Sequence, residues 1–261
     1  MSADDPSYSV RLAETAEDLL GAQRLRYAVF VAELGGDGPD VDHAAGLERD
    51  RFDAFCDHLI LVDNRRNPAG LDHVVGAYRV MPGARRAEAG RFYSETEYDL
   101  DPLLRLGRNL LELGRSCVHA DHRGGTAMFH LWNGLADYVL DRGIEVMFGV
   151  ASFHGTDVAA LAGPLSMLHH HHLAPPEMRV TARAPYCQTM NLIAPEALDR
   201  KAAMAATPAL IKAYLRLGGF VGEGAWIDHD FNTTDVCLVM DTEKMSAKHR
   251  EFYVRKRARD G

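Results

Sequence analysis

The amino-acid sequence predicts a mixed α/β fold, and two local patterns carry this prediction. Residues 58–63 and 73–80 are β-branched runs separated by a turn-rich segment, which is the pattern of an antiparallel hairpin. Residues 110–152 follow the order strand, Gly-rich turn, helix, strand, which is typical of a βαβ unit with two parallel strands. Together they predict an antiparallel hairpin that leads into a parallel pair of one mixed sheet.

The composition is that of a soluble globular protein. The chain has 261 residues, of which 47% are hydrophobic and 25% are charged, and ordinary globular domains have this balance. No apolar run approaches the ~20 residues that span a bilayer. The first residues are acidic and lack the basic and apolar regions of a secretory signal. We therefore expect a cytoplasmic protein.

Local signals define the N-terminal elements. Residues 8–12 are a predicted strand, and a helix is expected from about Thr15, because Thr15 and Asp18 make a capping-box-like start. Residues 35–50 are rich in Gly, Asp and Pro and show no apolar periodicity. We expect a long loop there, and loops of this length inside a compact domain are often functional.

The βαβ unit follows from periodicity. A predicted strand at residues 110–119 runs into a turn at residues 120–126. Apolar residues then recur at helical spacing from residue 128 to 139, and Gly143 ends the helix. Residues 144–152 are the second strand of the unit.

Downstream of this unit the signals are shorter. Residues 186–193 and 235–241 are predicted strands, and residues 195–206 and 211–217 are helical stretches between them. Gly218 closes the second helical stretch.

No internal repeat or low-complexity linker divides the chain. We expect a single domain over residues 1–261, with a helical insertion at residues 194–225 between the last two strands and a basic C-terminal tail at residues 243–261. The formal net charge is −8, from 29 Lys and Arg against 37 Asp and Glu, and the acids concentrate in the first fifty residues. The tail can meet an acidic carrier protein or a membrane surface, or it is simply a solvated helix end.

Several other patterns carry little functional weight. Arg85, Arg86 and the basic tail lack interleaved aromatic side chains arranged for base stacking, and the net charge is negative, so no nucleic-acid binding is expected. The run His169–His172 is expected at a helix–loop junction rather than at a metal, because consecutive residues rarely converge on one ion. His58 and Asp63 match an H-x4-D acyltransferase pattern, but residues five apart on a strand face opposite sides. The scattered cysteines predict neither disulfides nor a zinc site; they are Cys56, Cys117, Cys187 and Cys237.

A Gly-rich turn lies where the predicted strand at residues 110–119 hands over to a helix. The backbone N–H groups at a helix N-terminus lack partners within the helix and attract a phosphate or pyrophosphate, and Arg123 would add a charge-assisted bond. The alternative is a plain tight turn. The turn comprises Arg123, Gly124, Gly125, Thr126 and Ala127.

The segment around this turn resembles motif A of the GNAT acyltransferases, whose Q/R-x-x-G-x-G/A loop cradles the pyrophosphate of coenzyme A or the phosphopantetheine arm of acyl carrier protein. Gly125 and Ala127 match the last two fixed positions, and His122 stands at the first. The resemblance implies a GNAT acyl-CoA N-acyltransferase-like fold with no permanently bound cofactor and no metal. Acyl carrier protein phosphopantetheine, or acyl-CoA, would be the acyl donor.

A closer resemblance is to the acyl-homoserine lactone synthases and their relatives. Their ordered signature is similar to four groups of residues here: Arg26 with Phe30, Asp50 with Asp53, the segment Gly76-Ala-Tyr-Arg79, and Glu112 with Arg115. Further segments resemble the ornithine-lipid N-acyltransferases. They make up a C-terminal half that we expect the lactone synthases to lack. These segments are residues 147–155, 168–173, 208–218 and 230–235.

The resemblance implies roles for the signature residues. Glu112 would be the base for the attacking amine, or would position a water that accepts the proton; alternatively it is an ordinary carboxylate on a sheet surface. Arg115 would share the site with Glu112, but residues three apart face opposite sides of a regular strand, so this requires a bulge.

The remaining signature residues would bind substrates. Arg79 and Arg26 suit the carboxylate of an amino acid, and Asp50 and Asp53 suit a cationic side chain; the same four residues also suit salt bridges that tie the long loop to the sheet. An apolar acyl chain needs an apolar pocket. We expect phenylalanine side chains to line it, although the same side chains suit the hydrophobic core equally well. The candidates are Phe30, Phe148 and Phe153.

The function these residues imply is N-acylation of an amino acid. A (3-hydroxy)fatty acyl group would move from acyl carrier protein to the α-amine of L-ornithine, giving lyso-ornithine lipid. The expected partners are acyl carrier protein, ornithine and, transiently, the inner-membrane surface. Two alternatives stay open: an acyl-homoserine lactone synthase or other N-acyl amino acid synthase, and a non-catalytic acyl-carrier-binding module.

Overall fold

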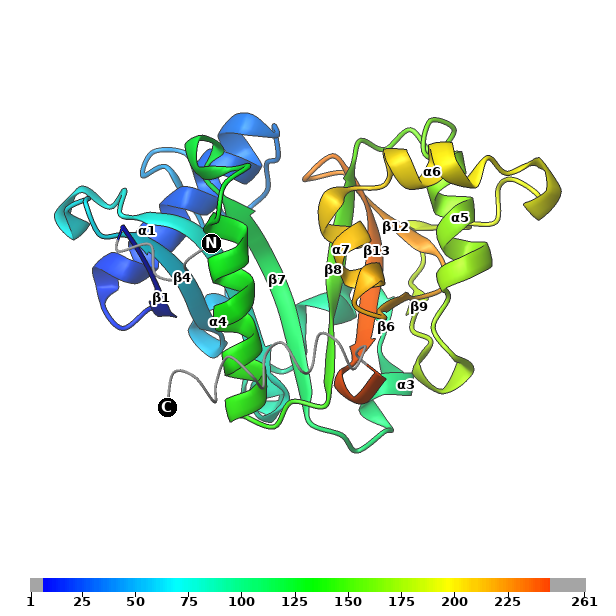
Figure 1. Cartoon of the computed structure of the whole chain (residues 1–261), viewed down its shortest axis with the longest axis horizontal. Helices are drawn as coiled ribbons and strands as arrows, with labels where there is room; N and C mark the ends of the chain where they lie inside the picture. The colour runs from blue at the N-terminus through cyan, green and yellow to red at the C-terminus, as the bar shows by residue number, and fades with distance from the viewer. Residues whose placement is uncertain (1–6, 245–261) are drawn as a thin grey trace. The chain divides into compact units, whose positions relative to one another are not determined.

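The chain folds into two compact units, and the predicted hairpin lies in the first of them. In the computed structural model, which describes residues 7–244, contacts divide the chain into two compact units (Figure 1). Unit 1 comprises residues 7–90 and 113–143 of the described chain, and unit 2 comprises residues 91–112 and 144–244. Strand β7, Leu110–Val118, begins in unit 2 and continues into unit 1.

The sheet of unit 1 has the order β1, β4, β5, β7. Strand β4 (Asp57–Asp63) pairs antiparallel with both β1 (Tyr8–Leu12) and β5 (Val74–Pro82). The hairpin prediction is therefore confirmed. In the β4–β5 register His58 stands opposite Arg79, and direct antiparallel partners place their side chains on the same face of a sheet.

Helix α1 (Ala16–Arg26) covers one face of this sheet. Ile60 and Val62, which alternate along β4, share a buried core cluster with Ala22 and Leu25 of α1. The helix begins as predicted: the Thr15 side chain accepts from the backbone N–H of Asp18, and the Asp18 carboxylate accepts from the backbone N–H of Thr15. A π-helix, η1 (Tyr27–Glu33), continues directly from α1, and π-helical turns are rare and frequent at functional sites.

Helix α4 (Ala127–Asp141) covers the opposite face, where glycines permit a close approach. A Cβ placed on Gly76 of β5 would lie 2.7 Å from Leu131 of α4, and one on Gly134 of α4 would lie 2.3 Å from Cγ1 of Val10 in β1. A side chain at either position would force its neighbour, Leu131 or Val10, to move. The helix of the βαβ unit, predicted from its periodicity, is confirmed.

This packing predicts the effect of adding one methyl group to α4. We expect Gly134→Ala to lower the free energy of unfolding by roughly 1–3 kcal/mol, because overpacking outweighs the better helix propensity of alanine. The matched control is Gly163→Ala in helix α5 (Ala162–His172), where the nearest atom to the new Cβ is 3.9 Å away. That variant should gain up to ~1 kcal/mol. Urea unfolding of both proteins measures the difference, and equal effects would contradict the close contact.

The predicted loop at residues 35–50 is not structureless. Two short strands, β2 (Val41–Asp42) and β3 (Leu47–Glu48), pair antiparallel within it. The expectation of a long loop was right for most of this segment, and it missed the two short strands because two-residue strands carry no periodicity and form by pairing alone. The small hairpin places Glu48 and Asp50 in fixed positions.

In unit 2 the first residues of β7 pair parallel with β8 (Val146–His154), from Leu110 with Val146 to Glu112 with Phe148. The parallel pair of the βαβ unit is thus confirmed. Strand β13 (Thr233–Asp241) runs antiparallel to the whole of β8. Further short strands extend the sheet: β12 (Ala225–Asp228) and β11 (Phe220–Val221) both pair with β13, and β10 (Cys187–Gln188) pairs with β12.

The C-terminal predictions were partly right. Helices α6 (Arg200–Ala206) and α7 (Ala209–Arg216) lie within the expected insertion, and β11 and β12 follow them before β13. The strand predicted at residues 186–193 is reduced to the two residues of β10. Helix α5 ends at His172, so the histidine run is its last turn. The smaller elements are α2 (Arg86–Ala89), α3 (Asp101–Leu104) and a pair of strands, β6 (Tyr98–Asp99) with β9 (Thr181–Ala182).

No helix in the described residues is long and apolar enough to cross a membrane. All four cysteines are free thiols. The basic tail predicted at residues 243–261 lies, apart from its first two residues, outside the described chain.

Candidate active site

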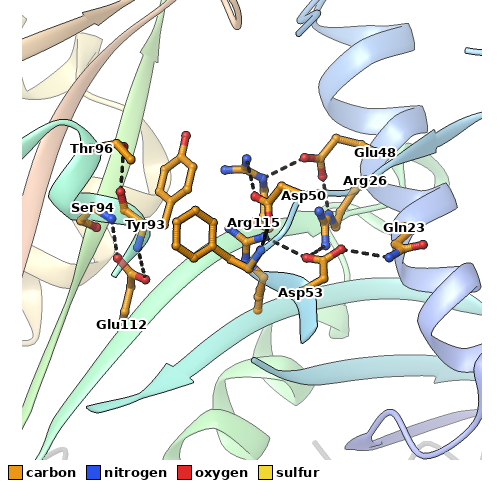
Figure 2. Close-up of polar contacts among 12 residues, drawn as sticks. Gln23, Arg26, Glu48, Asp50, Asp53, Tyr93, Ser94, Thr96, Glu112 and Arg115 are labelled. Atoms are coloured by element: carbon orange, nitrogen blue, oxygen red, sulfur yellow. Dashed lines mark hydrogen bonds and ion pairs between the residues drawn. The ribbon is translucent and has the colours of Figure 1, made fainter. Parts of the chain in front are cut away.

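Six charged side chains of unit 1 form a closed ring beyond the end of α1 (Figure 2). Each carboxylate of the ring bridges two arginines: Glu48 binds Arg26 and Arg115, Asp50 binds Arg79 and Arg115, and Asp53 binds Arg26 and Arg79. We call these six residues the charged ring. Fully ionised, its three positive and three negative charges cancel.

Arg26 is the most deeply placed member of the ring. It is the last residue of α1, and its side chain is 1% exposed. Its Nε donates to Glu48 through a very short contact, and its Nη1 donates to Oδ1 of Asp53 at 2.8 Å. Gln23, nearly one turn earlier, donates to the other oxygen of Asp53 at 2.9 Å. The end of α1 therefore holds the turn at Asp53 against the helix.

The other two arginines come from the sheet. Nη1 of Arg79, on β5, lies 2.6 Å from Asp50 and 2.8 Å from Asp53. Arg115, on β7, donates from Nε to Glu48 at 3.1 Å and from Nη2 to Asp50 at 3.3 Å. Arg115 has φ of +50°, a left-handed conformation that is uncommon for residues other than glycine and concentrates at functional sites. The strand is thus irregular at the position where the sequence required a break in alternation.

The charges of the ring hold two of its carboxylates, Glu48 and Asp53, ionised. Burial alone would raise the pKa of Glu48, but the charges of Arg115 and Arg26 lower it to about 2. Burial likewise opposes ionisation of Asp53, and Arg26 with Arg79 overcomes it and lowers that pKa well below its usual value. The arginines are always charged. Glu48 and Asp53 consequently stay in ion pairs with the arginines at neutral pH.

This shift predicts acid lability. Because the folded-state pKa of Glu48 lies near 2 against 4.5 when unperturbed, the unfolded chain binds more protons in that window, and stability is lost as pH falls from about 4.5 to 2. Glu48 alone should account for roughly 3 kcal/mol. Urea midpoints measured at steps between pH 7 and 2.5 test this, and the Glu48→Gln protein should show a shallower decline. Equal slopes in both proteins would contradict the assignment.

Glu112 belongs to a second cluster, in unit 2 (Figure 2). Its Oε2 accepts from the backbone N–H of Tyr93 at 2.9 Å, and its Oε1 accepts from that of Ser94 at 2.6 Å. These N–H groups open the 3₁₀ helix η5 (Tyr93–Thr96). Glu112 is 5% exposed. The carboxylate therefore anchors a turn with both oxygens, a contact for which the sequence held no signal.

The Gly-rich turn joins the 3₁₀ helix η6 (Ala120–His122) to α4. Gly124 has φ of +77°, and a Cβ on Gly124 or Gly125 would meet nothing within 4 Å. Thr126 is the N-cap of α4, but its side chain makes no capping hydrogen bond. Thr126 thus does not cap the helix with its own side chain, and the role of this turn with Ala127 in binding a phosphate group stays a prediction.

Arg123 is placed differently from the expectation. Its guanidinium forms a two-pronged pair with Glu33 at 2.5 and 2.7 Å, and its Nε donates to the carbonyl of Val118 at 2.9 Å. An incoming phosphate would compete with Glu33 for it. His122, at the first motif position, contacts the Tyr8 hydroxyl at 2.7 Å and Arg66 at 3.3 Å.

The phenylalanines are mainly core residues. Phe148 and Phe153 of β8 are each 2% exposed, and Phe148 stacks edge-on against Phe92 at 5.0 Å between ring centroids. Phe30, in η1, packs against the core cluster on the α1 face. Their role as walls of an acyl slot stays a prediction.

One group in the described residues has the spacing of a metal site. Oxygens of Glu97, Asp228 and Asp235, all buried in unit 2, lie within 4.8 Å of one another. Both Asp230 and Phe231 donate backbone N–H bonds to Asp228. The group contains no histidine, and three clustered carboxylates do not by themselves define a metal site.

Two residues of the charged region were missed from the sequence. Glu48 was not assigned a role, although it stands two residues before Asp50 and so falls on the same side of an extended segment. His58 was considered only in the H-x4-D pattern, yet its Nε2 lies 3.2 Å from the carbonyl oxygen of Asp53. Asp63, its supposed partner, instead binds Arg65 at the other end of β4.

The mixed sheet is that of an N-acyltransferase of the GNAT class, and residues 25–133 match the model of the acetyltransferase (GNAT) domain. The L-ornithine N(alpha)-acyltransferase of Rhodobacter capsulatus is 63% identical over 98% of this chain and 98% of its own. That of Brucella abortus is 40% identical over 95% of this chain and 89% of its own. The chain belongs to the family of the L-ornithine N(alpha)-acyltransferases.

Solved structures of lower identity share the fold. The CoA-dependent acyl-homoserine lactone synthase BjaI is 15% identical, with a TM-score of 0.50, over 92% of this chain and 82% of its own. A second such synthase, MesI, is 14% identical with a TM-score of 0.50 and covers 94% of this chain. The expectation that the lactone synthases lack the C-terminal half was therefore wrong, because these alignments run through it.

Proposed function

We propose that this protein transfers a (3-hydroxy)fatty acyl group from acyl carrier protein to the α-amine of L-ornithine, giving lyso-ornithine lipid. Family membership supports the reaction and the amino acid. The observation in the site that carries the proposal is the charged ring, which offers both signs of charge to a substrate that has one carboxylate and two amines. If the ring served only to tie the loop to the sheet, we would expect every buried N–H donor of its arginines to have a hydrogen-bond partner within the protein.

Arg26 supports a binding role. Its Nη2 is buried and makes no hydrogen bond with any described residue, although burying such a donor without a partner costs about 1–3 kcal/mol. A substrate carboxylate would satisfy it, with Arg79 close by through their shared partner Asp53. Asp50 and Asp53 would attract the side-chain ammonium of ornithine.

For the donor, one feature of unit 1 supports a phosphopantetheine arm. The N-terminus of α4, with its glycine turn, suits the phosphate of that arm. Acyl carrier protein and acyl-CoA both present this arm, and we propose the carrier protein as the donor.

The chemistry requires no covalent enzyme intermediate. The neutral amine attacks the thioester carbonyl, a C–N bond forms, the C–S bond breaks and the thiol leaves. Glu112 contributes by holding the turn at Tyr93 and Ser94, as its two N–H contacts support. Its assignment as the base stays a prediction from the sequence, and it is the alternative to the histidine that is proposed as the base in the next subsection. Arg115 contributes by fixing Glu48 and Asp50.

The test uses the purified full chain with ornithine and either 3-hydroxyacyl–acyl carrier protein or the matching acyl-CoA. We expect lyso-ornithine lipid by mass spectrometry, formed faster from the carrier protein. A faster reaction with acyl-CoA would contradict the donor proposal alone. Carrier binding without any product would favour the non-catalytic module.

We also propose that the basic tail, residues 243–261, makes transient contact with the anionic inner-membrane surface or the acidic carrier. Its lysines and arginines support this. Co-sedimentation with phosphatidylglycerol vesicles should fall when these residues are neutralised. Unchanged sedimentation and unchanged carrier affinity would leave the tail a solvated terminus.

A further inference from the structure

We propose that His58 is the group that accepts the proton from the attacking α-amine. The inference rests on the proposed function and adds the catalytic base to it. His58 is the histidine of the H-x4-D pattern, but its partner is the backbone carbonyl of Asp53 rather than the Asp63 side chain.

His58 lies at the edge of the charged ring. It is 7% exposed on β4 and stands directly opposite Arg79 in the β4–β5 register, so both side chains extend from the α1 face of the sheet. Its Nε2 lies 3.2 Å from the carbonyl oxygen of Asp53. The imidazole is thereby fixed beside the proposed binding groups for ornithine.

This contact determines the tautomer. A carbonyl oxygen can only accept, so Nε2 must carry the hydrogen and the neutral ring keeps its lone pair on Nδ1. Nδ1 makes no hydrogen bond with any described residue. A backbone carbonyl that orients one nitrogen while the other is left as an acceptor is the arrangement that a general base requires.

Two carboxylates of the charged ring and its arginines are poor proton acceptors near neutral pH. The carboxylates Glu48 and Asp53 are held ionised with lowered pKa values and are therefore weak bases, and the arginines hold their protons. Burial, reinforced by the charges of Arg26 and Arg79, lowers the pKa of His58 against the opposing pull of the Asp53 carboxylate and carbonyl. The imidazole is consequently neutral when the amine arrives.

The step balances without any further reactant. The nitrogen of the α-amine forms a bond to the thioester carbonyl carbon, and one of its protons passes to Nδ1 of His58. The C–S bond then breaks, and the imidazolium returns the proton to the departing thiolate, directly or through solvent. The enzyme ends in its starting form.

The test compares the pH dependence of kcat in the wild-type protein and in His58→Gln. Glutamine can still donate to the Asp53 carbonyl but cannot accept a proton at neutral pH. We expect the wild-type kcat to fall in acid with an apparent pKa below 6.5, and kcat of His58→Gln to drop about 10²-fold or more. The variant should lose the acid limb and rise steadily with pH as the free amine deprotonates, with KM for ornithine changed far less.

Matched controls separate a chemical role from a structural one. His171→Gln replaces an exposed histidine of α5 and should keep both kcat and the acid limb. In His58→Ala, added imidazole should restore part of kcat, which a purely structural histidine would not allow. Retention of more than half of kcat by His58→Gln, with its acid limb intact, would overturn the inference.

The wild-type protein tests the inference even if the variants do not fold. If kcat of the wild-type protein shows no acid limb between pH 4.5 and 7, that result by itself overturns the role of His58. A wild-type protein that makes no lyso-ornithine lipid at any pH would instead reject the proposed function.

Discussion

Replacing Arg26 with methionine is expected to lower the free energy of unfolding by about 3–5 kcal/mol, because removing one partner from a buried ion-pair network leaves uncompensated charge. Glu48 and Asp53 would each keep a single arginine while remaining buried. Methionine approximates the volume of the lost side chain, so the effect reports charge rather than a cavity. Urea unfolding at pH 7, followed by circular dichroism, measures it.

The control for Arg26→Met is Arg123→Met. Arg123 also forms a close pair, with Glu33, but the two side chains are 41% and 38% exposed, and such pairs contribute about 0–1 kcal/mol. If the two substitutions cost the same, the ring does not form the buried network described above. If Arg26→Met costs far more, the network is the main electrostatic support of unit 1.

The second large effect concerns catalysis. Replacing Glu112 with alanine should reduce kcat about 10²-fold or more, the scale expected when a catalytic site loses its geometry. The backbone N–H groups of Tyr93 and Ser94 would lose their acceptor, and Ser94 is 1% exposed. Glu112→Gln should also be impaired, because the side-chain NH2 of glutamine would face the backbone N–H of either Tyr93 or Ser94, and neither of those groups can accept a hydrogen bond.

Three measurements test this role of Glu112. Thiol release from the acyl donor gives kcat, hydrogen exchange gives the protection of the Tyr93 and Ser94 amides, and the pH profile locates the base. We expect lost protection together with an acid limb that persists, since His58 sets that limb. Glu196→Gln, at an exposed position, serves as the control. An unchanged kcat in both Glu112 variants would remove Glu112 from the mechanism.

The parts of the fold that the sequence predicts are those with local causes. The β4–β5 hairpin follows from two β-branched runs, the start of α1 from the Thr15 capping box, and α4 from apolar spacing. The small strands β2, β3, β10, β11 and β12 escape prediction because two to four residues carry no periodicity. They form only when a partner strand is present.

The site residues also divide into those that the sequence predicts and those that it does not. The signature residues Arg26, Asp50, Asp53 and Arg79 do converge, as the resemblance implied. The closing member, Glu48, and the engagement of Arg123 by Glu33 depend on segments far apart in the chain. Residue type and spacing cannot predict such pairings. The anchoring of Glu112 by two backbone N–H groups is of this kind too, because every residue type but proline offers the same donor.

The most direct test of the account is the position of the acyl group on ornithine. The purified chain, given 3-hydroxyacyl–acyl carrier protein and L-ornithine, should yield one product whose fragmentation in tandem mass spectrometry places the acyl group on the α-nitrogen and leaves the δ-amine free. Acylation of the δ-nitrogen, or a lactone product, would contradict the proposed orientation of the substrate carboxylate on Arg26 and the side-chain ammonium on Asp50 and Asp53.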